Sequence, residues 1–515
     1  MDFEEKTHKE LDHQTEIHHG NQFKKIFKQG SWYFIGSLLT KATGFFLLPV
    51  YTKYLSPADY GVLNSLNSIT NLLPIFISLY LDAAFGLYYF SEKKISEQRV
   101  QLLYSTLFWF ICLWGVVVVI AAMLISPFTF QPLLNVSFLP YIPLIMIPAL
   151  FGQLSLLGSV FLRSNLKVKE FSILNFVVFI CATSITILLL TGFKMGIRAN
   201  LYGAAVGSLI SFSYYLYISI KYSLLNFSFN WKILWTSLLF SLPLIPNIAA
   251  GWIGGLSDRL ILVYYGKIEQ VGLYSISAQI ALILYMINDA LTQVQGPIAL
   301  SALTENREEG KKQISEFLSF FVWIILFCYL LLTFFSKEIL YFMTDVRYHS
   351  AYQLVAVLAF IYVLSGIYRV FTTILSFHEK MWVISCGAII SAIVSMIINF
   401  LLIPYWGQWA AAWARLFSMF GYTAWLYYWS QKVDPIPVNY RLIVISLSVA
   451  VALLTIEKIV EINQYFQFWI ELGVKIVLCG IYVSMMFFLP SLNEVKVLNM
   501  RLWDKMIKHF ELRWH

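Results

Sequence analysis

Residues 102–126 read LLYSTLFWFICLWGVVVVIAAMLIS and contain no acidic or basic side chain. An α-helix rises about 1.5 Å per residue, so this stretch is long enough to cross the roughly 30 Å hydrocarbon core of a bilayer. Stretches of similar length and apolarity recur along the whole chain. Lipid offers no partners to backbone polar groups, so only helices or closed barrels span it, and continuous rather than alternating runs exclude a barrel. The sequence therefore predicts an all-α integral membrane protein.

The composition supports the same class. Hydrophobic residues make up 59% of the 515 positions, charged residues make up 12%, and the mean hydropathy is +0.71. Roughly a quarter of the residues of a soluble domain are charged, so this chain lacks the polar side chains that a water-facing surface needs. The net charge of +8 lies largely in short segments beside the apolar runs. This placement favours a membrane protein, and we expect no nucleic-acid partner.

The apolar runs predict about fourteen membrane spans. The polar segment before residue 30 has no apolar h-region, so the first span is expected to act as an uncleaved signal-anchor. The spans are placed near residues 30–52, 62–89, 102–126, 137–161, 170–191, 198–220, 234–264, 272–298, 314–336, 349–376, 380–403, 408–430, 440–460 and 467–490.

Basic residues indicate how these spans are oriented. With the N-terminus in the cytoplasm, most of the 36 lysines and arginines fall in inner segments. Cytoplasmic loops are enriched in these residues, so we expect both termini in the cytoplasm. The basic, amphipathic segment 491–515 is expected to lie on anionic lipid of the inner leaflet. The predicted outer segments hold only Lys53, Lys194, Arg198, Lys267, Lys337, Arg347 and Lys458.

An internal repeat divides the chain. Residues 54–62 read YLSPADYGV and residues 265–273 read YGKIEQVGL, while LYGAA at 201–205 pairs with QWAAA at 408–412. Two matches at nearly the same offset predict two six-helix lobes related by a pseudo-two-fold axis along the membrane normal. The expected parts are a cytoplasmic tail 1–29, an N-lobe 30–221, a linker 222–233, a C-lobe 234–431, a helix pair 432–490 and a cytoplasmic tail 491–515.

Signatures of soluble enzymes are missing from the sequence. It contains no Walker loop, no G-x-G-x-x-G after a strand, no H-E-x-x-H and no C-x-x-C. The histidines of the polar N-terminal tail are expected to be solvated rather than to bind a metal. We therefore predict that the chain is not an enzyme and has neither cofactor nor metal centre. The cysteines fall separately inside apolar runs and are expected to be small core residues: Cys112, Cys181, Cys328, Cys386 and Cys479.

Ionisable residues inside the predicted spans are the candidate functional groups. Each costs at least a few kcal/mol in lipid and must therefore face protein or water. Asp258 with Arg259, and also Asp82, leave a purely structural pairing open. Three cations have no carboxylate one turn away on the same helix, which favours an electropositive cavity for a phosphate-bearing substrate. These cations are Lys41, Arg369 and Arg415.

The seventh predicted span contains several residues that interrupt helices. Pro243 and Pro246 lie near its start, and Gly251, Gly254 and Gly255 follow. Discontinuities of this kind occur where a membrane helix bends or lines a cavity. The pattern predicts a helix that moves during transport.

Several short motifs occur in a characteristic order. They are KQG at 28–30, LP at 48–49, LSPADYG at 55–61, DR at 258–259, VGLYS at 271–275, NFLLIP at 399–404, WGQ at 406–408 and AAA at 410–412. Over roughly residues 24–490 the chain resembles the polysaccharide biosynthesis protein family. These are the Wzx-type O-antigen or oligosaccharide flippases of the multidrug/oligosaccharidyl-lipid/polysaccharide exporter superfamily.

The resemblance implies two lobes around a central cavity and alternating access. It implies that an undecaprenyl-pyrophosphate-linked oligosaccharide moves from the inner to the outer leaflet of a bacterial inner membrane. We expect a monomer, with a glycan polymerase and glycosyltransferases as partners. It also assigns substrate binding to Lys41, Arg259, Arg369 and Arg415. The carboxylates Asp82, Asp258 and Asp289 are the candidates for coupling to a cation or proton.

Two other functions remain open from the sequence. The first is a multidrug or metabolite antiporter of the same superfamily, which would need an acidic cation site built on residues such as Asp82 or Asp289. The second is a membrane enzyme such as a glycan polymerase or ligase, which would place its catalytic groups in a long outer loop. The longest predicted outer loop, about residues 336–348, is short for that role.

Overall fold

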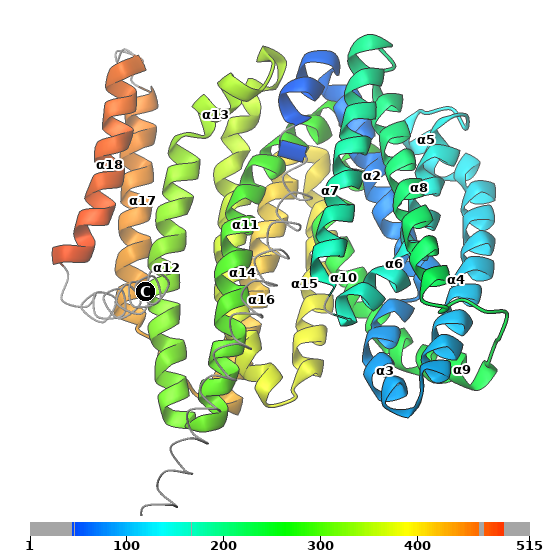
Figure 1. Cartoon of the computed structure of the whole chain (residues 1–515). Helices are drawn as coiled ribbons and strands as arrows, with labels where there is room; N and C mark the ends of the chain where they lie inside the picture. Colours follow the sequence, from blue (N-terminus) through cyan, green and yellow to red (C-terminus); the bar gives the residue numbers. More distant parts are fainter. Residues whose placement is uncertain (1–43, 46, 166, 463–467, 489–515) are drawn as a thin grey trace, which may run out of the picture. The chain divides into compact units, whose positions relative to one another are not determined.

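The computed structural model describes residues 44–45, 47–165, 167–462 and 468–488 (Figure 1). Within these ranges the regular structure is entirely helical. Ten of the described helices are long and apolar enough to cross a membrane. Helices α2 (Pro57–Ser78) and α3 (Leu81–Ile95) give an eleventh crossing if they are counted as one span bent by 45°. The prediction of a multi-pass, all-α membrane protein is confirmed.

Three of the predicted spans do not belong to those eleven. The first, near 30–52, lies mostly outside the described residues. The other two are helices of spanning length, α16 (Gln408–Val433) and α18 (Phe468–Phe488). The structure is therefore consistent with about fourteen spans.

The chain folds into two compact units. The described residues within 1–47 and 69–245 form the first, which we call the N-unit, and those within 48–68 and 246–515 form the second, the C-unit. The predicted seventh span is divided between them. Its first part, α9 (Trp231–Ser241) with the 3-10 turn η3 (Leu242–Leu244), packs against α3 and α4 of the N-unit, and α10 (Ile245–Tyr264) continues into the C-unit. The break lies at the prolines that the sequence singled out, since proline cannot continue a helical hydrogen-bond ladder.

The N-unit contains a second break that positions a charged residue. Leu79 and Tyr80 both have positive φ, 47° and 60°, a conformation that side chains other than glycine rarely adopt. This turn separates α2 from α3 and places Asp82 in the first turn of α3. The other helices of this unit are α4 (Glu97–Ile125), α5 (Phe130–Leu134), α6 (Tyr141–Ser164), α7 (Val168–Ile187) and α8 (Ile197–Lys221).

The C-unit is built around three long helices that pack closely on one another. These are α11 (Ile268–Glu305), α14 (Tyr352–Phe377) and α16. Helix α17 (Tyr440–Ile462) packs against α12 (Arg307–Phe334), and α18 packs beside α17 at the edge of the unit (Figure 1). The remaining helices are α13 (Ser336–Met343) and α15 (Met381–Trp406). The predicted outer loop near 336–348 is thus mostly helical, as α13 followed by the 3-10 turn η4 (Val346–Ala351).

The cysteines correct one expectation. Only Cys479 is buried, Cys386 is exposed, and Cys112, Cys181 and Cys328 are half-buried. All five are free thiols. An apolar run predicts a membrane helix, but it does not show which face of the helix packs against protein. A cysteine in such a run therefore need not lie in the core.

Candidate substrate site

Four helices of the C-unit bring most of the sequence-predicted charges together. On α10, Asp258 and Arg259 are both buried, and Arg259 Nη1 lies 3.2 Å from Asp258 Oδ1. Tyr274 of α11 donates its hydroxyl to Asp258 Oδ2. Arg259 also donates to the Ser275 hydroxyl at 3.3 Å and to the Gly255 carbonyl at 3.0 Å. Both charges therefore have several partners, which is what a buried ion pair needs in order to be stable.

Arg415 of α16 lies next to this pair. Its Nη1 lies 3.4 Å from the Gly255 carbonyl, the same oxygen that Arg259 contacts. Its Nε is buried and has no hydrogen-bond partner in the described structure. The guanidinium lies within electrostatic range of Tyr274, Tyr362 and Asp258. No carboxylate of the described residues lies within ion-pair distance of Arg415, so this arginine is the surplus cation of the site.

Arg369 of α14 has a carboxylate partner on a neighbouring helix. Its Nη1 lies 2.9 Å from Asp289 Oδ1 and 2.9 Å from the Thr292 hydroxyl, both on α11. The guanidinium also lies 5.6 Å from the centre of the Tyr285 ring. Sequence spacing along one helix does not reveal this pair, because Arg369 and Asp289 meet only when α14 packs on α11.

A tyrosine links the two groups of charges. The Tyr362 ring lies 5.5 Å from the Tyr285 ring, which contacts Arg369, and Tyr362 also lies within electrostatic reach of Arg415. Together the groups hold three arginines and two aspartates, so the site carries one excess positive charge. Arginine is suited to phosphate because its planar fork donates two parallel hydrogen bonds.

A small cavity opens beside Arg369. Its volume is about 210 Å³, and the described residues that line it are all polar. Gln295 is only 6% exposed, and its Nε2 has no hydrogen-bond partner among the described residues. The lining residues are Thr292, Gln295, Arg369, Thr372 and Thr373. Sequence analysis missed Gln295 and the threonines, because uncharged polar residues in a membrane helix give only a weak signal.

Two predicted residues lie elsewhere. Asp82 belongs to the N-unit, where it is half-buried and its Oδ1 is buried without a hydrogen-bond partner in the described part of the chain. Lys41 lies outside the described residues. The substrate and coupling roles given to all seven charged residues stay predictions.

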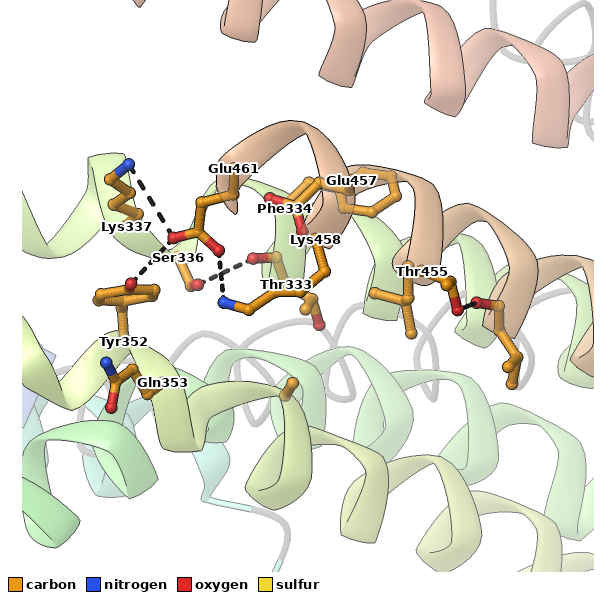
Figure 2. Close-up of a pocket in the computed structure, with 13 residues that line it drawn as sticks. Thr333, Phe334, Ser336, Lys337, Tyr352, Gln353, Thr455, Glu457, Lys458 and Glu461 are labelled. Carbon is orange, nitrogen blue, oxygen red and sulfur yellow. Dashed lines mark hydrogen bonds and ion pairs between the residues drawn. The ribbon is translucent and has the colours of Figure 1, made fainter. Parts of the chain in front are cut away.

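A larger cavity, of about 420 Å³, lies between α14 and α17 (Figure 2). Its charged side is organised by Glu461, which accepts a hydrogen bond from the Tyr352 hydroxyl at 2.8 Å and pairs with Lys458 and Lys337. Figure 2 shows these three side chains reaching Glu461 from different sides. The apolar part of the cavity lining consists of Phe334, Ala356, Val451 and Leu454. Sequence analysis did not single out this cavity.

Glu457, which lines this cavity, pairs with Lys475 of α18, a residue that is only 1% exposed. Its Nζ lies 2.6 Å from Glu338, 3.2 Å from Glu471 and 3.9 Å from Glu457. These carboxylates come from α13, α18 and α17, so one buried ammonium connects the last helix pair to the rest of the C-unit. Several partners are needed, since a buried lysine without them would lose its charge.

A second ionic cluster is centred on Asp434, which follows α16. The Asp434 carboxylate lies 3.0 Å from Arg307, 2.8 Å from Lys311 and 3.0 Å from His378. Burial alone would raise the pKa of Asp434, but hydrogen bonds from Lys311, His378 and Arg307 outweigh burial and lower the pKa to about 2. The carboxylate is thus charged at neutral pH and ties the start of α12 to the ends of α14 and α16.

Comparison with known proteins gives the family. Residues 50–351, more than half of the chain, match the family described as polysaccharide biosynthesis protein. The chain is also 24% identical over 291 residues to an Lsg locus protein of Haemophilus influenzae, which covers 55% of this chain and 68% of that protein.

Solved structures show the same fold. A lipid II flippase, MurJ, in an inward closed conformation has a TM-score of 0.65 at 15% identity, over 88% of this chain and 98% of that one. An inward-facing multidrug resistance MATE transporter of the MOP superfamily has a TM-score of 0.58 at 11% identity, over 78% of this chain and 97% of that one. At these identities the likeness concerns the fold alone. The chain belongs to the polysaccharide biosynthesis protein family and has the fold that the lipid II flippase MurJ shares with a MATE transporter of the MOP superfamily.

Proposed function

We propose that this protein is a flippase for an undecaprenyl-pyrophosphate-linked oligosaccharide. It would move this lipid from the inner to the outer leaflet of the bacterial inner membrane by alternating access, with both termini in the cytoplasm. The family and the fold support a membrane carrier used in polysaccharide synthesis. The observation that carries the substrate assignment is the excess arginine of the C-unit.

Arg415 is the group best suited to hold the pyrophosphate. Its buried Nε lacks a partner, and the neighbouring Asp258 is already engaged by Arg259 and Tyr274. A phosphate oxygen would supply the missing acceptor and the missing negative charge together. In surroundings that exclude water, such a charge-assisted hydrogen bond is stronger than at an exposed surface. Binding would therefore compensate the cost of moving the anionic group through the membrane interior.

Helix α10 leaves room for a ligand beside this arginine. A Cβ added at Gly251, Gly254 or Gly255 would meet no atom within 4 Å, so three glycines expose open backbone along the helix. A glycine surface lets a bulky group approach the helix closely. The Gly255 carbonyl, which accepts from both Arg259 and Arg415, lies in this stretch.

The carboxylates of the C-unit favour the flippase over a cation-coupled antiporter. Asp258 and Asp289 each have an arginine partner, which leaves neither as an open cation site. Asp82 of the N-unit has an unpartnered Oδ1 and is the carboxylate we assign to coupling, if transport is coupled to a cation or proton.

The test uses the native cell, in which the chromosomal gene is exchanged for one that encodes a variant at Arg415. We expect Arg415→Ala to abolish surface polysaccharide and to leave lipid-linked oligosaccharide accumulating inside, with normal protein in the membrane. Arg415→Lys should retain part of the activity, because a point charge replaces the bidentate fork. Arg441→Ala removes an exposed arginine at the start of α17 and serves as the matched control. Wild-type surface polysaccharide in Arg415→Ala would contradict the proposal.

A further inference from the structure

We propose that the cavity beside Arg369 binds one sugar ring of the transported lipid and recognises an N-acyl group on that ring through Gln295. This inference rests on the proposed function and specifies which chemical group of the transported lipid the substrate site recognises. Pockets for drug-sized ligands measure roughly 300–1,000 Å³. At about 210 Å³ the cavity is smaller than those pockets, and therefore suits a single ring rather than a whole oligosaccharide.

The charge of the cavity argues against the pyrophosphate as its occupant. Among the described residues that line it, Arg369 alone is charged, and Asp289 neutralises it at 2.9 Å. The cavity is therefore close to electrically neutral, whereas the surplus positive charge lies at Arg415. The cavity beside Arg369 therefore suits a neutral polar ligand, and the surroundings of Arg415 suit an anion.

The hydrogen-bonding groups of the cavity show what such a ligand must offer. The hydroxyls of Thr372 and Thr373 both donate to the Arg369 carbonyl, at 2.7 and 3.1 Å. The Thr292 hydroxyl donates to the Asn288 carbonyl at 2.9 Å. With their hydrogens used, these three oxygens can only accept from a ligand. A phosphate at neutral pH offers almost only hydrogen-bond acceptors. Its oxygens would face the threonine oxygens with no hydrogen to share between them.

Gln295, by contrast, requires a hydrogen-bond acceptor on the ligand. Its Nε2 is a buried donor without a partner, in a side chain that is 6% exposed and lines the cavity. An unpartnered buried donor is costly, so a ligand that brings a strong acceptor binds with advantage. An N-acyl sugar provides a carbonyl for Gln295, while its amide N–H and ring hydroxyls donate to the threonine oxygens. A plain hexose offers the hydroxyls but only a weaker acceptor to the amide.

The test measures binding of defined lipids to the purified full-length protein in lipid nanodiscs. The probes are undecaprenyl pyrophosphate bearing N-acetylglucosamine, the same lipid bearing glucose, and undecaprenyl pyrophosphate alone. We expect the N-acetylated lipid to bind about tenfold more tightly than the glucose lipid, the effect of one good hydrogen bond. Gln295→Leu should abolish this preference, because it weakens binding of the N-acetylated lipid far more than binding of the glucose lipid.

Two controls separate a ligand-binding role of Gln295 from a structural one. Gln295→Leu removes a donor that has no partner, so the melting temperature of the ligand-free variant should equal or exceed that of the wild type. Gln353→Leu, in the larger cavity between α14 and α17, should keep the wild-type preference.

The outcomes distinguish this inference from the proposed function. Equal binding of the two sugar lipids by the wild type, or an unchanged preference in Gln295→Leu, would overturn the role of the cavity while the flippase proposal stands. Failure of the wild type to bind any of the three lipids would overturn both. A drop in melting temperature of ligand-free Gln295→Leu would assign Gln295 to the fold instead of the substrate.

Discussion

Gly61 of α2 and Gly272 of α11 pack reciprocally where the two helices begin. A Cβ on Gly61 would lie 2.2 Å from the carbonyl oxygen of Ile268, and a Cβ on Gly272 would lie 2.0 Å from that of Pro57. Both glycines stand at the same position of the repeated segment, and Pro57 corresponds to Ile268. The internal repeat thus forms a contact in which each copy supplies the glycine that admits the other copy's backbone.

This contact predicts that Gly272→Ala destabilises the protein. The added methyl would lie far closer to a carbonyl oxygen than real atoms approach, so the backbones must move apart. Overpacking of this kind costs about 1–3 kcal/mol, which thermal unfolding in detergent would register as a lower melting temperature. Gly421→Ala is the control, because a Cβ there meets no atom within 4 Å. An unchanged melting temperature in Gly272→Ala would show that the helices are not so close.

The ion pair between Arg369 and Asp289 predicts non-additive mutations. Arg369→Gln or Asp289→Asn alone breaks this ion pair and keeps one of its two charges between α11 and α14, and each should lower stability by about 2 kcal/mol. The double variant removes both charges of the pair, so its melting temperature should lie above both single variants. A double-mutant cycle on the purified protein measures this coupling. Strictly additive losses would mean that the two side chains do not depend on each other.

Lys475 should be essential for holding the last helix pair. Lys475→Met would remove the ammonium shared by Glu338, Glu471 and Glu457. Among the described residues it would leave only Lys337, 3.4 Å from Glu471, as a cation within ion-pair distance of them. Loss of a partner from a buried ionic group costs about 3–5 kcal/mol. We expect a lower melting temperature and faster proteolysis between α16 and α17. Adding Glu471→Gln should restore part of the loss. Lys458→Ala, at a lysine whose side chain is 55% exposed, should cost far less.

The cluster at Asp434 predicts a dependence of stability on pH. The folded-state pKa of about 2 is below the ordinary value of 3.8, so the carboxylate contributes stability above pH 3.8 that is lost as the pH falls through 2. The difference corresponds to about 2 kcal/mol. Comparing wild type with Asp434→Asn by thermal unfolding, we expect their gap to be widest near neutral pH and to close between pH 4 and 2. A gap that stays constant in this range would exclude Asp434 as the titrating group.

The sequence by itself determined the class, the length and number of most spans, and the few charged positions that lipid would not tolerate without partners. These features are local, because bilayer thickness fixes the number of residues in a helix and lipid leaves backbone groups no partners outside it. The repeat was also visible in the sequence, since it depends on a glycine at a fixed distance from a helix start.

Only the tertiary structure decided which charges pair and which face a cavity. Arg369 and Asp289 lie far apart in the sequence, and so do Lys475 and Glu338, yet each pair meets where helices pack. The unpartnered amide of Gln295 became visible only once its surroundings were known. In a membrane helix nearly every face is apolar, so periodicity does not distinguish the side turned to lipid from the side turned to protein. Helix packing alone makes that choice, and with it the substrate site.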